Sequence, residues 1–155
     1  FMLYRSGETL ERRVLQVTQP LSMVIAMSGV ESLTARTVAR VREAWQRNPD
    51  LYERIFDEID TLVGVGLDAL ARRDYDTLGE TMNINQGLLN AMQVSSWELE
   101  ELIQVARNHG AVGAKLTGGG GGGSVIALCP DSSKQVARAI REAGYQAIEV
   151  EVGGA

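Results

Sequence analysis

The sequence predicts an α+β domain of the ferredoxin-like type, in which helices cover one face of an antiparallel sheet. The first observation is that short apolar runs at 21–27, 112–116, 125–128 and 148–152 are typical of strands. The second is that most of the segments between these runs show helical periodicity. With three middle helices set aside as an insertion, the order becomes β-α-β-β-α-β, which is the split β-α-β arrangement.

The first elements are separated by prolines. Residues 14–17 and 21–27 are expected to form strands. A helix follows Ser32 or Thr34 and ends before Pro49, because the residue before a proline disfavours helical backbone. A second helix starts near residue 50 and places apolar side chains on one face, namely Leu51, Ile55, Ile59, Leu62 and Leu70. A third helix is expected over 75–91.

The remaining helices have recognisable ends. Ser95 followed by Glu98 predicts a capping box, in which each side chain bonds the other residue's backbone N–H. Gly110 is expected to end that helix in a left-handed conformation. A last helix opens at Asp131 and Ser132. Residues 148–152 alternate with acidic side chains, which predicts a half-exposed final strand.

Composition limits the classes of function. The chain has 155 residues, one cysteine and a net charge of −5. A length of this order predicts one domain, and the acidic balance argues against general binding of nucleic acid or of an anionic membrane. The polar residues within the uncharged stretch 14–30 exclude a membrane span there. A lone cysteine favours a reducing compartment, so we expect a cytoplasmic protein. The first residue is Phe1, which suggests that the sequence begins inside a longer reading frame.

Gly118 to Gly123 is a run of six glycines between two expected strands. A simple hairpin needs only about two to five loop residues, so a mere connection does not explain the run. Successive backbone N–H groups can form a concavity for phosphate oxygens, and a loop without side chains can pack closely against another loop. We favour these two uses over a flexible turn, which stays an alternative.

The residues around this run resemble a known family. The segment 115–124, K-L-T-G-G-G-G-G-G-S, is similar to the third motif of the GHMP kinases, K-L-T-G-A-G-G-G-G-C. The segment 78–89, L-G-E-T-M-N-I-N-Q-G-L-L, resembles L-G-E-L-M-N-I-N-H-G-L-L of mevalonate kinases within that superfamily. Ser28-Gly29-Val30 followed by Thr34 resembles a D-T-G…S-T stretch. The resemblance extends over about residues 20–152.

The resemblance implies ATP-dependent phosphorylation of mevalonate in isoprenoid biosynthesis, with ATP and Mg²⁺ as cofactors. It also implies that residues 1–155 are a C-terminal domain, in which residues 1–20 are an edge segment from an N-terminal kinase half. In the family that other half carries the ATP loop, the catalytic aspartate and the side chains that bind Mg²⁺. No catalytic or metal-binding residue is therefore expected here, and the chain alone is predicted to be inactive.

The site residues that the resemblance implies fall in two groups. Gly118, Gly119, Gly120, Gly121, Gly122 and Gly123 would contact the nucleotide and its phosphates. Thr34, Lys115 and Thr117 would bind substrate. Other roles stay open: Lys115 is equally consistent with a solvated or ion-paired residue, and Thr34 with a helix cap or first turn. The chain departs from the family pattern at Met27, Ser28, Thr81, Gln86, Gly119 and Ser124.

Two classes of function remain. The first is half of a small-molecule kinase that acts on mevalonate. A related kinase that acts on a phosphorylated mevalonate, or a related decarboxylase, stays an alternative. The kinase class predicts an exposed apolar face where the N-terminal half would dock, and hence a homodimer or aggregation of the chain alone. The second is a stand-alone ferredoxin-like module that binds a ligand or a partner. Among the asparagines of the third helix, Asn85 is expected to be the buried one that contacts neighbouring structure.

Overall fold

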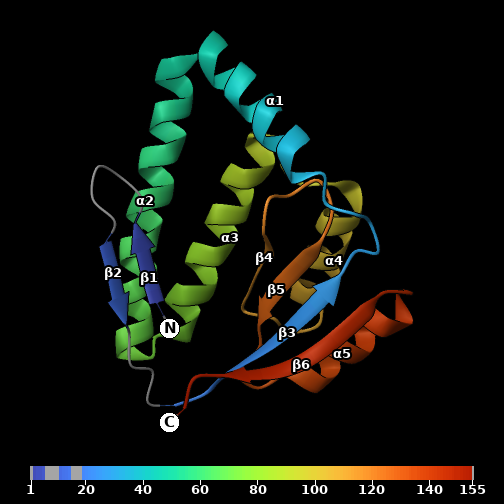
Figure 1. Cartoon of the computed structure of the whole chain (residues 1–155). Coiled ribbons are helices and arrows are strands. Elements are labelled where there is room, and N and C mark those ends of the chain that lie inside the picture. Colours follow the sequence, from blue (N-terminus) through green and yellow to red (C-terminus); the bar gives the residue numbers. More distant parts are fainter. Residues whose placement is uncertain (1, 6–10, 15–18, 155) are drawn as a thin grey trace.

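A four-stranded antiparallel sheet is the centre of the fold (Figure 1). The computed structural model describes residues 2–5, 11–14 and 19–154. The strands are β3 (Leu21–Met27), β4 (Gly113–Thr117), β5 (Ser124–Leu128) and β6 (Gln146–Val152), in the spatial order β4-β5-β3-β6. All three pairings are antiparallel. This is the order of a split β-α-β domain, so the predicted fold class is confirmed.

Two helices cover one face of the sheet. They are α4 (Trp97–Asn108) and α5 (Ser133–Glu142), which lie behind the strands in Figure 1. The side chains that alternate toward them form the core with the apolar faces of both helices. Its fully buried members include Val24, Leu99, Leu102, Leu116, Val125, Val136 and Ile140.

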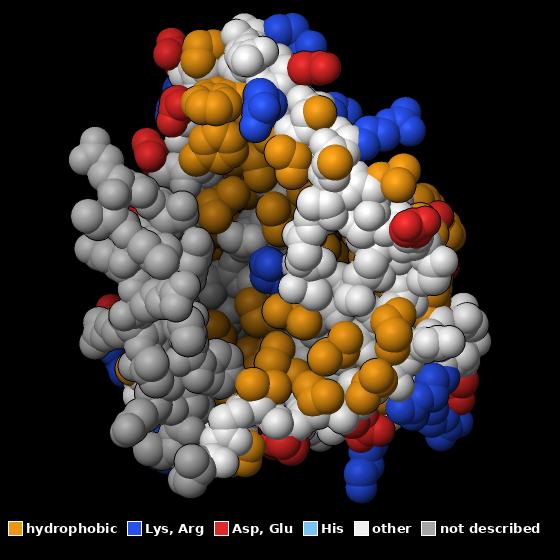
Figure 2. All heavy atoms as spheres, viewed as in Figure 1, with side chains coloured by type: hydrophobic (Ala, Val, Ile, Leu, Met, Phe, Trp, Pro, Cys, Tyr) orange, Lys and Arg blue, Asp and Glu red, His pale blue; other side chains and the backbone are white. Residues whose placement is uncertain are grey.

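The opposite face of the sheet is open. Strand register places Lys115, Ile126, Ile25 and Ile148 in one row across the four strands on this face. Ile148 is 51% exposed. Figure 2 shows hydrophobic side chains gathered over the sheet on the side facing the reader. In the part of the chain that the structure describes, Figure 1 shows no helix on this side.

The predicted helical insertion lies between β3 and α4. It consists of α1 (Thr34–Arg47), α2 (Pro49–Arg72) and α3 (Tyr75–Ala91). Pro49 occupies the first turn of α2, where a missing N–H costs nothing, and α1 ends just before it as expected. Trp45 meets Phe56 edge to face across the α1–α2 turn, with ring centroids 5.8 Å apart. Helix α3 runs along β4 and joins the insertion to the sheet.

Two predictions about local structure need comment, and one pair of strands was not predicted. The cap of α4 is Ser96, whose Oγ accepts from the Leu99 N–H, and not Ser95. The physical reason is that Ser95 Oγ already accepts from the side chain of Gln86. A short antiparallel pair, β1 (Met2–Arg5) with β2 (Glu11–Val14), was not predicted. The strand expected over 14–17 shares only Val14 with β2, and its residues 15–17 lie outside the described residues.

None of the helices within residues 19–154 is long and apolar enough to cross a bilayer.

Candidate functional site

The glycine loop, Gly118–Gly123, connects β4 to β5 and packs against two other segments. The N–H of Gly121 donates to the carbonyl of Val94 in the α3–α4 turn at 2.8 Å. The N–H of Gly123 donates to Val30 at 2.9 Å, and the Gly123 carbonyl accepts from Ser28 at 2.8 Å. The loop is therefore held between the turn after β3 and the turn after α3.

Side chains would not fit at several loop positions. A Cβ on Gly120 would lie 2.1 Å from the Val94 carbonyl oxygen, and Gly120 has a φ of +74°, which disfavours other residues. A Cβ on Gly119 would lie 2.4 Å from the side chain of Thr34. Position 119 is alanine in the family pattern, and glycine at this position lets the side chain of Thr34 approach the backbone closely.

Some of the loop's backbone N–H groups form no hydrogen bond with the residues that the structure describes. Those of Gly121 and Gly123 are used within the domain, as described above. The N–H groups of Gly118, Gly119, Gly120 and Gly122 have no acceptor among the described residues. Free N–H groups in successive residues are the donor set that anion-binding loops present to phosphate oxygens.

The hydroxyls of Ser32 and Thr34 border the loop at the start of α1. Ser32 Oγ donates to the Gly120 carbonyl at 2.7 Å and lies 3.1 Å from Thr34 Oγ1. The cap position of α1 is Leu33, which makes no side-chain capping bond, so Thr34 is a first-turn residue. Its side chain is exposed beside Gly119. The structure thus brings Thr34 to the loop.

Lys115 and Thr117 lie on β4, two residues apart, on the open face of the sheet. The ammonium of Lys115 donates to the Leu116 carbonyl at 2.7 Å, and burial lowers its pKa. No hydrogen bond joins Lys115 to Thr34 within residues 19–154. Thr117 is exposed directly before the loop. Lys115 therefore lies in the strand that leads into the loop, and its ammonium group is hydrogen-bonded to a backbone carbonyl.

Helix α3 fastens the outer edge of β4 through side-chain amides. Asn83 donates to the Val112 carbonyl and accepts from the Ala114 N–H, both at 3.1 Å. Gln86 Oε1 accepts from the Leu116 N–H at 2.9 Å. Asn85, expected to make such contacts, is half-buried and forms no side-chain hydrogen bond with the described residues. The residue that does is Asn83.

A close backbone approach makes these amide contacts reachable. A Cβ on Gly79 would lie 2.5 Å from the Val112 carbonyl oxygen, and one on Gly113 would lie 2.5 Å from the Cα of Gly79. Gly79, Asn83 and Gln86 are spaced i, i+4, i+7, so they share one face of α3. This spacing could have identified Asn83 and Gln86 from the sequence, because it places both amides on the helix face that carries Gly79.

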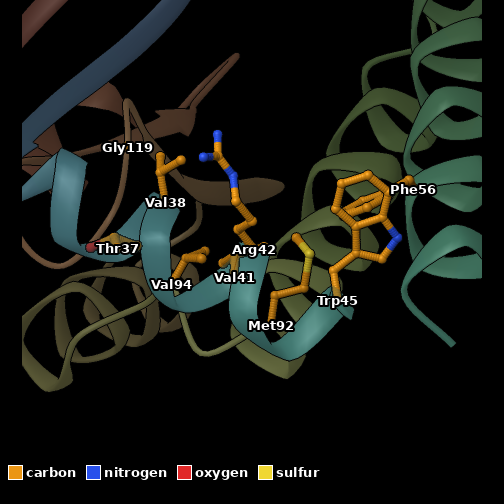
Figure 3. A pocket seen from close by; sticks show the side chains of 9 residues that line it. All are labelled: Thr37, Val38, Val41, Arg42, Trp45, Phe56, Met92, Val94 and Gly119. Carbon is orange, nitrogen blue, oxygen red and sulfur yellow. The ribbon is translucent and has the colours of Figure 1, made fainter. Parts of the chain in front are cut away.

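Two hollows flank α1 next to the loop. One, of about 300 Å³, is mainly apolar and touches Gly119 (Figure 3). In Figure 3, Val38, Val41 and Arg42 of α1 line it together with Met92, and Trp45 and Phe56 lie at one end. The other, of about 460 Å³, touches Gly121 and contains Arg36 and Arg40. The loop therefore borders both hollows.

Carboxylates do not gather at this site. Within the described ranges, no group of three or more His, Cys, Asp or Glu residues is arranged to hold a metal ion. The donors at the loop fit phosphate oxygens, whereas a site for Mg²⁺ needs oxygen acceptors such as carboxylates. These residues can thus donate to an anion such as phosphate, and they supply no set of ligands for a metal ion.

Comparison with known proteins agrees with this geometry. A protein-family model described as "GHMP kinases C terminal" matches residues 67–146. The chain is 44% identical over 131 residues to a mevalonate kinase of Methanothermobacter thermautotrophicus, covering 84% of this chain and 43% of that protein. It is 38% identical over 149 residues to a mevalonate kinase of Pyrococcus abyssi, covering 93% and 43%. The chain thus spans less than half the length of these curated relatives.

A solved structure gives the same result in three dimensions. The L. major mevalonate kinase in complex with R-mevalonate superimposes with a TM-score of 0.91 at 31% identity, covering 99% of this chain and 49% of that one. Fold and site together define a split β-α-β domain with a packed glycine loop between its two middle strands and a helical insertion. The chain belongs to the family of GHMP kinase C-terminal domains.

Proposed function

We propose that this chain is the C-terminal half of an ATP-dependent mevalonate kinase. One observation carries the proposal: the glycine loop packs against the start of α1, and the N–H groups of Gly118 and Gly119, which have no acceptor among the described residues, lie at its accessible part beside Thr34. The curated relatives support mevalonate as the substrate, because both are mevalonate kinases. Gly118–Gly123 would contact the nucleotide phosphates, and Thr34, Lys115 and Thr117 would contact mevalonate. Lys115 would first turn its ammonium away from Leu116.

The proposed division of labour follows from the donor set. Phosphoryl transfer needs positioned phosphates, a metal, cationic groups and an oriented nucleophile. The loop supplies neutral donors that orient phosphate oxygens. We assign Mg²⁺ and the catalytic aspartate to the N-terminal half, since the described residues gather no carboxylates. ATP, when bound between the halves, supplies the transferred phosphoryl group.

The N-terminal half would cover surface that is apolar and open in this chain. Ile25, Ile126 and Ile148 lie in one row on the uncovered face of the sheet. A soluble domain rarely exposes such a face without a partner. We assign residues 1–20 to that half as an edge segment, because β1 and β2 pair with each other and not with the four-stranded sheet. Cytoplasmic localisation and homodimerisation stay predictions from the sequence.

The experiment compares the chain alone with the chain joined to an N-terminal kinase half. ADP release is measured with mevalonate and, separately, with phosphomevalonate. We expect the joined protein to use mevalonate and the 155-residue chain to release no ADP. Mevalonate-dependent ADP release by the chain alone would refute the division of labour. A preference for phosphomevalonate would refute the substrate assignment.

A loop substitution tests the site. Gly120→Ala places a Cβ against the Val94 carbonyl at a positive φ, so the loop must move. We expect the joined protein to lose activity by roughly 100-fold, the scale of an ångström-size misplacement. Gly118→Ala is the matched control, since it has a similar φ of +85° but open space around it. Its activity should fall by less than about tenfold, since left-handed strain alone costs roughly 1–2 kcal/mol. Equal losses for both variants would contradict the packed-loop interpretation.

A further inference from the structure

Gln86 is buried, with 2% of its surface exposed, and it uses every polar atom of its side chain. Its Oε1 accepts from the Leu116 N–H at 2.9 Å. Its Nε2 donates to Glu100 Oε1 at 2.8 Å and to Ser95 Oγ at 3.2 Å. An amide with one acceptor contact and two donor contacts has a fixed orientation.

Two of the three partners of Gln86, Leu116 and Ser95, belong to the segments that support the glycine loop. Leu116 belongs to β4 and comes two residues before Gly118, so it is the stem of the loop. Ser95 follows Val94, whose carbonyl accepts from the Gly121 N–H at 2.8 Å and so holds the tip. One side chain of α3 therefore connects the stem and the segment that holds the tip.

We propose that Gln86 is a positioning residue for the kinase reaction: it sets where the glycine loop stands relative to Thr34. This rests on the proposed function, because the loop is assigned there to nucleotide phosphates. Without Gln86, the β4 stem and the α3–α4 turn would no longer share a support. The free N–H groups of the loop would then shift relative to α1, although Gln86 itself touches no ligand.

Purely structural packing is the competing role for a buried glutamine. It predicts that substitutions lower thermal stability and leave the kinetic constants of the folded protein unchanged. Positioning predicts a change in the constants themselves. The two roles are separated by kcat and KM measured well below the unfolding temperature, with the concentration of folded protein determined independently.

Gln86→Leu removes all three hydrogen bonds at similar volume. In the joined protein we expect kcat/KM for ATP to fall by roughly tenfold or more, since sub-ångström displacement of a positioned group is costly. Gln104→Met is the matched control, because Gln104 is exposed and bonds only Asn108 on its own helix. Its constants should stay within about twofold of the unsubstituted protein, as for other surface substitutions.

A reciprocal exchange of Gln86 and Glu100 tests whether the hydrogen bonds of Gln86 account for the change in the kinetic constants. Gln86→Glu alone places two carboxylates at positions 86 and 100 in contact, which is unfavourable for like charges. When Gln86→Glu is combined with Glu100→Gln, the hydrogen bond between the two positions is restored, with the amide now donating from position 100 and the carboxylate accepting at position 86. The carboxylate introduced at position 86 then still accepts from Leu116, and the Ser95 hydroxyl can turn to donate to it. We expect this double variant to recover kcat/KM to within roughly threefold, as double-mutant coupling predicts.

The outcomes are distinct. Loss in Gln86→Leu with recovery in the exchanged pair supports the proposal. A lowered unfolding temperature with unchanged kcat and KM overturns it and leaves a structural role only. Failure of the exchanged pair to recover, with the pair folded, also overturns it. If the unsubstituted joined protein does not phosphorylate mevalonate, the proposed function itself has failed, which is a different result.

Discussion

The two edges of the four-stranded sheet are treated very differently. At the β4 edge, side chains bond the outward backbone groups: Asn83 and Gln86 from α3, Arg107 from α4, and Lys115 from β4 itself. At the β6 edge, the described residues supply one such bond, from Arg141 to the Ala147 carbonyl at 2.9 Å. An unpaired strand edge is a template for pairing with another chain, so proteins protect edges selectively. Here the protected edge is the one that leads into the glycine loop.

The difference shows how a loop without side chains is positioned. The loop has no side chains to hold it, so its position depends on its stem and on its neighbours' carbonyls. Side-chain amides of α3 bond the outer backbone groups of β4 and so fix the stem without adding another strand. The β6 edge carries no such loop and has few side-chain contacts. Substitutions at the two edges should therefore differ in magnitude.

The largest effect is expected at Gly79. Gly79→Ala places a Cβ 2.5 Å from the Val112 carbonyl oxygen, so α3 must separate from β4 and its amides lose their partners. We expect a loss of about 3 kcal/mol or more, measured by urea unfolding. Gly87→Ala on the same helix meets nothing within 4 Å and should instead add up to about 1 kcal/mol. A destabilisation of both variants by the same amount would contradict the close-approach argument.

A smaller loss is expected at Asn83. Asn83→Leu keeps the branched shape of the side chain and leaves the Val112 carbonyl and the Ala114 N–H without their side-chain partner. We expect a loss of about 2 kcal/mol in chemical denaturation, since each unmade buried bond is costly. Asn85→Leu is the control on the same helix and should change stability by less than about 0.5 kcal/mol. An equal or larger loss for the Asn85 variant would show that the wrong asparagine has been identified.

Arg141 gives the corresponding test at the β6 edge. Arg141→Met removes the hydrogen bond to Ala147 and a 3.8 Å ion pair with Glu149. The side chain of Arg141 is 51% exposed and that of Glu149 is 36% exposed. An exposed ion pair is screened by solvent, so we expect a loss below about 1 kcal/mol in the same denaturation assay. A loss as large as that of Asn83→Leu would remove the contrast between the edges.

The smallest expected effect is a change in the pH dependence of stability, and it involves Tyr145 just before β6. The Tyr145 hydroxyl donates to the Glu101 carboxylate, and this bond raises the pKa of Tyr145 to about 12 from an ordinary value of 10.0. Because the folded pKa is the higher one, the bond's contribution is full below pH 10 and is lost as pH rises to about 12. We expect the melting-temperature difference between the unsubstituted chain and Tyr145→Phe to shrink across that window. A difference that stays constant from about pH 8 to about pH 12 would contradict this.

Much of the fold could be predicted from local pattern. The helix stop before Pro49 and the glycine end of α4 at Gly110 depend on backbone preferences within a few residues, and both are where they were expected. The cap of α4 was assigned to Ser95 instead of Ser96, because local sequence cannot show that Gln86 already engages Ser95. The choice of Asn85 over Asn83 failed for the same reason. Both depend on contacts with residues distant in sequence.

The glycine loop was recognisable, but its anchors were not. Six consecutive glycines indicate close approach without saying to what. The partners, Val30 and Val94, act through backbone carbonyls, which any residue would supply. The side-chain types at these two positions therefore do not indicate the contact, which is visible only in the folded chain.

The positions of Val30 and Val94 have a mechanical consequence. Val30 lies just before the helical insertion and Val94 just after it, so both ends of the insertion are tied to the same short loop. The insertion therefore leaves the sheet beside the glycine loop at Val30 and returns beside the same loop at Val94. A substitution that displaces the glycine loop would thus act on both ends of the insertion at once.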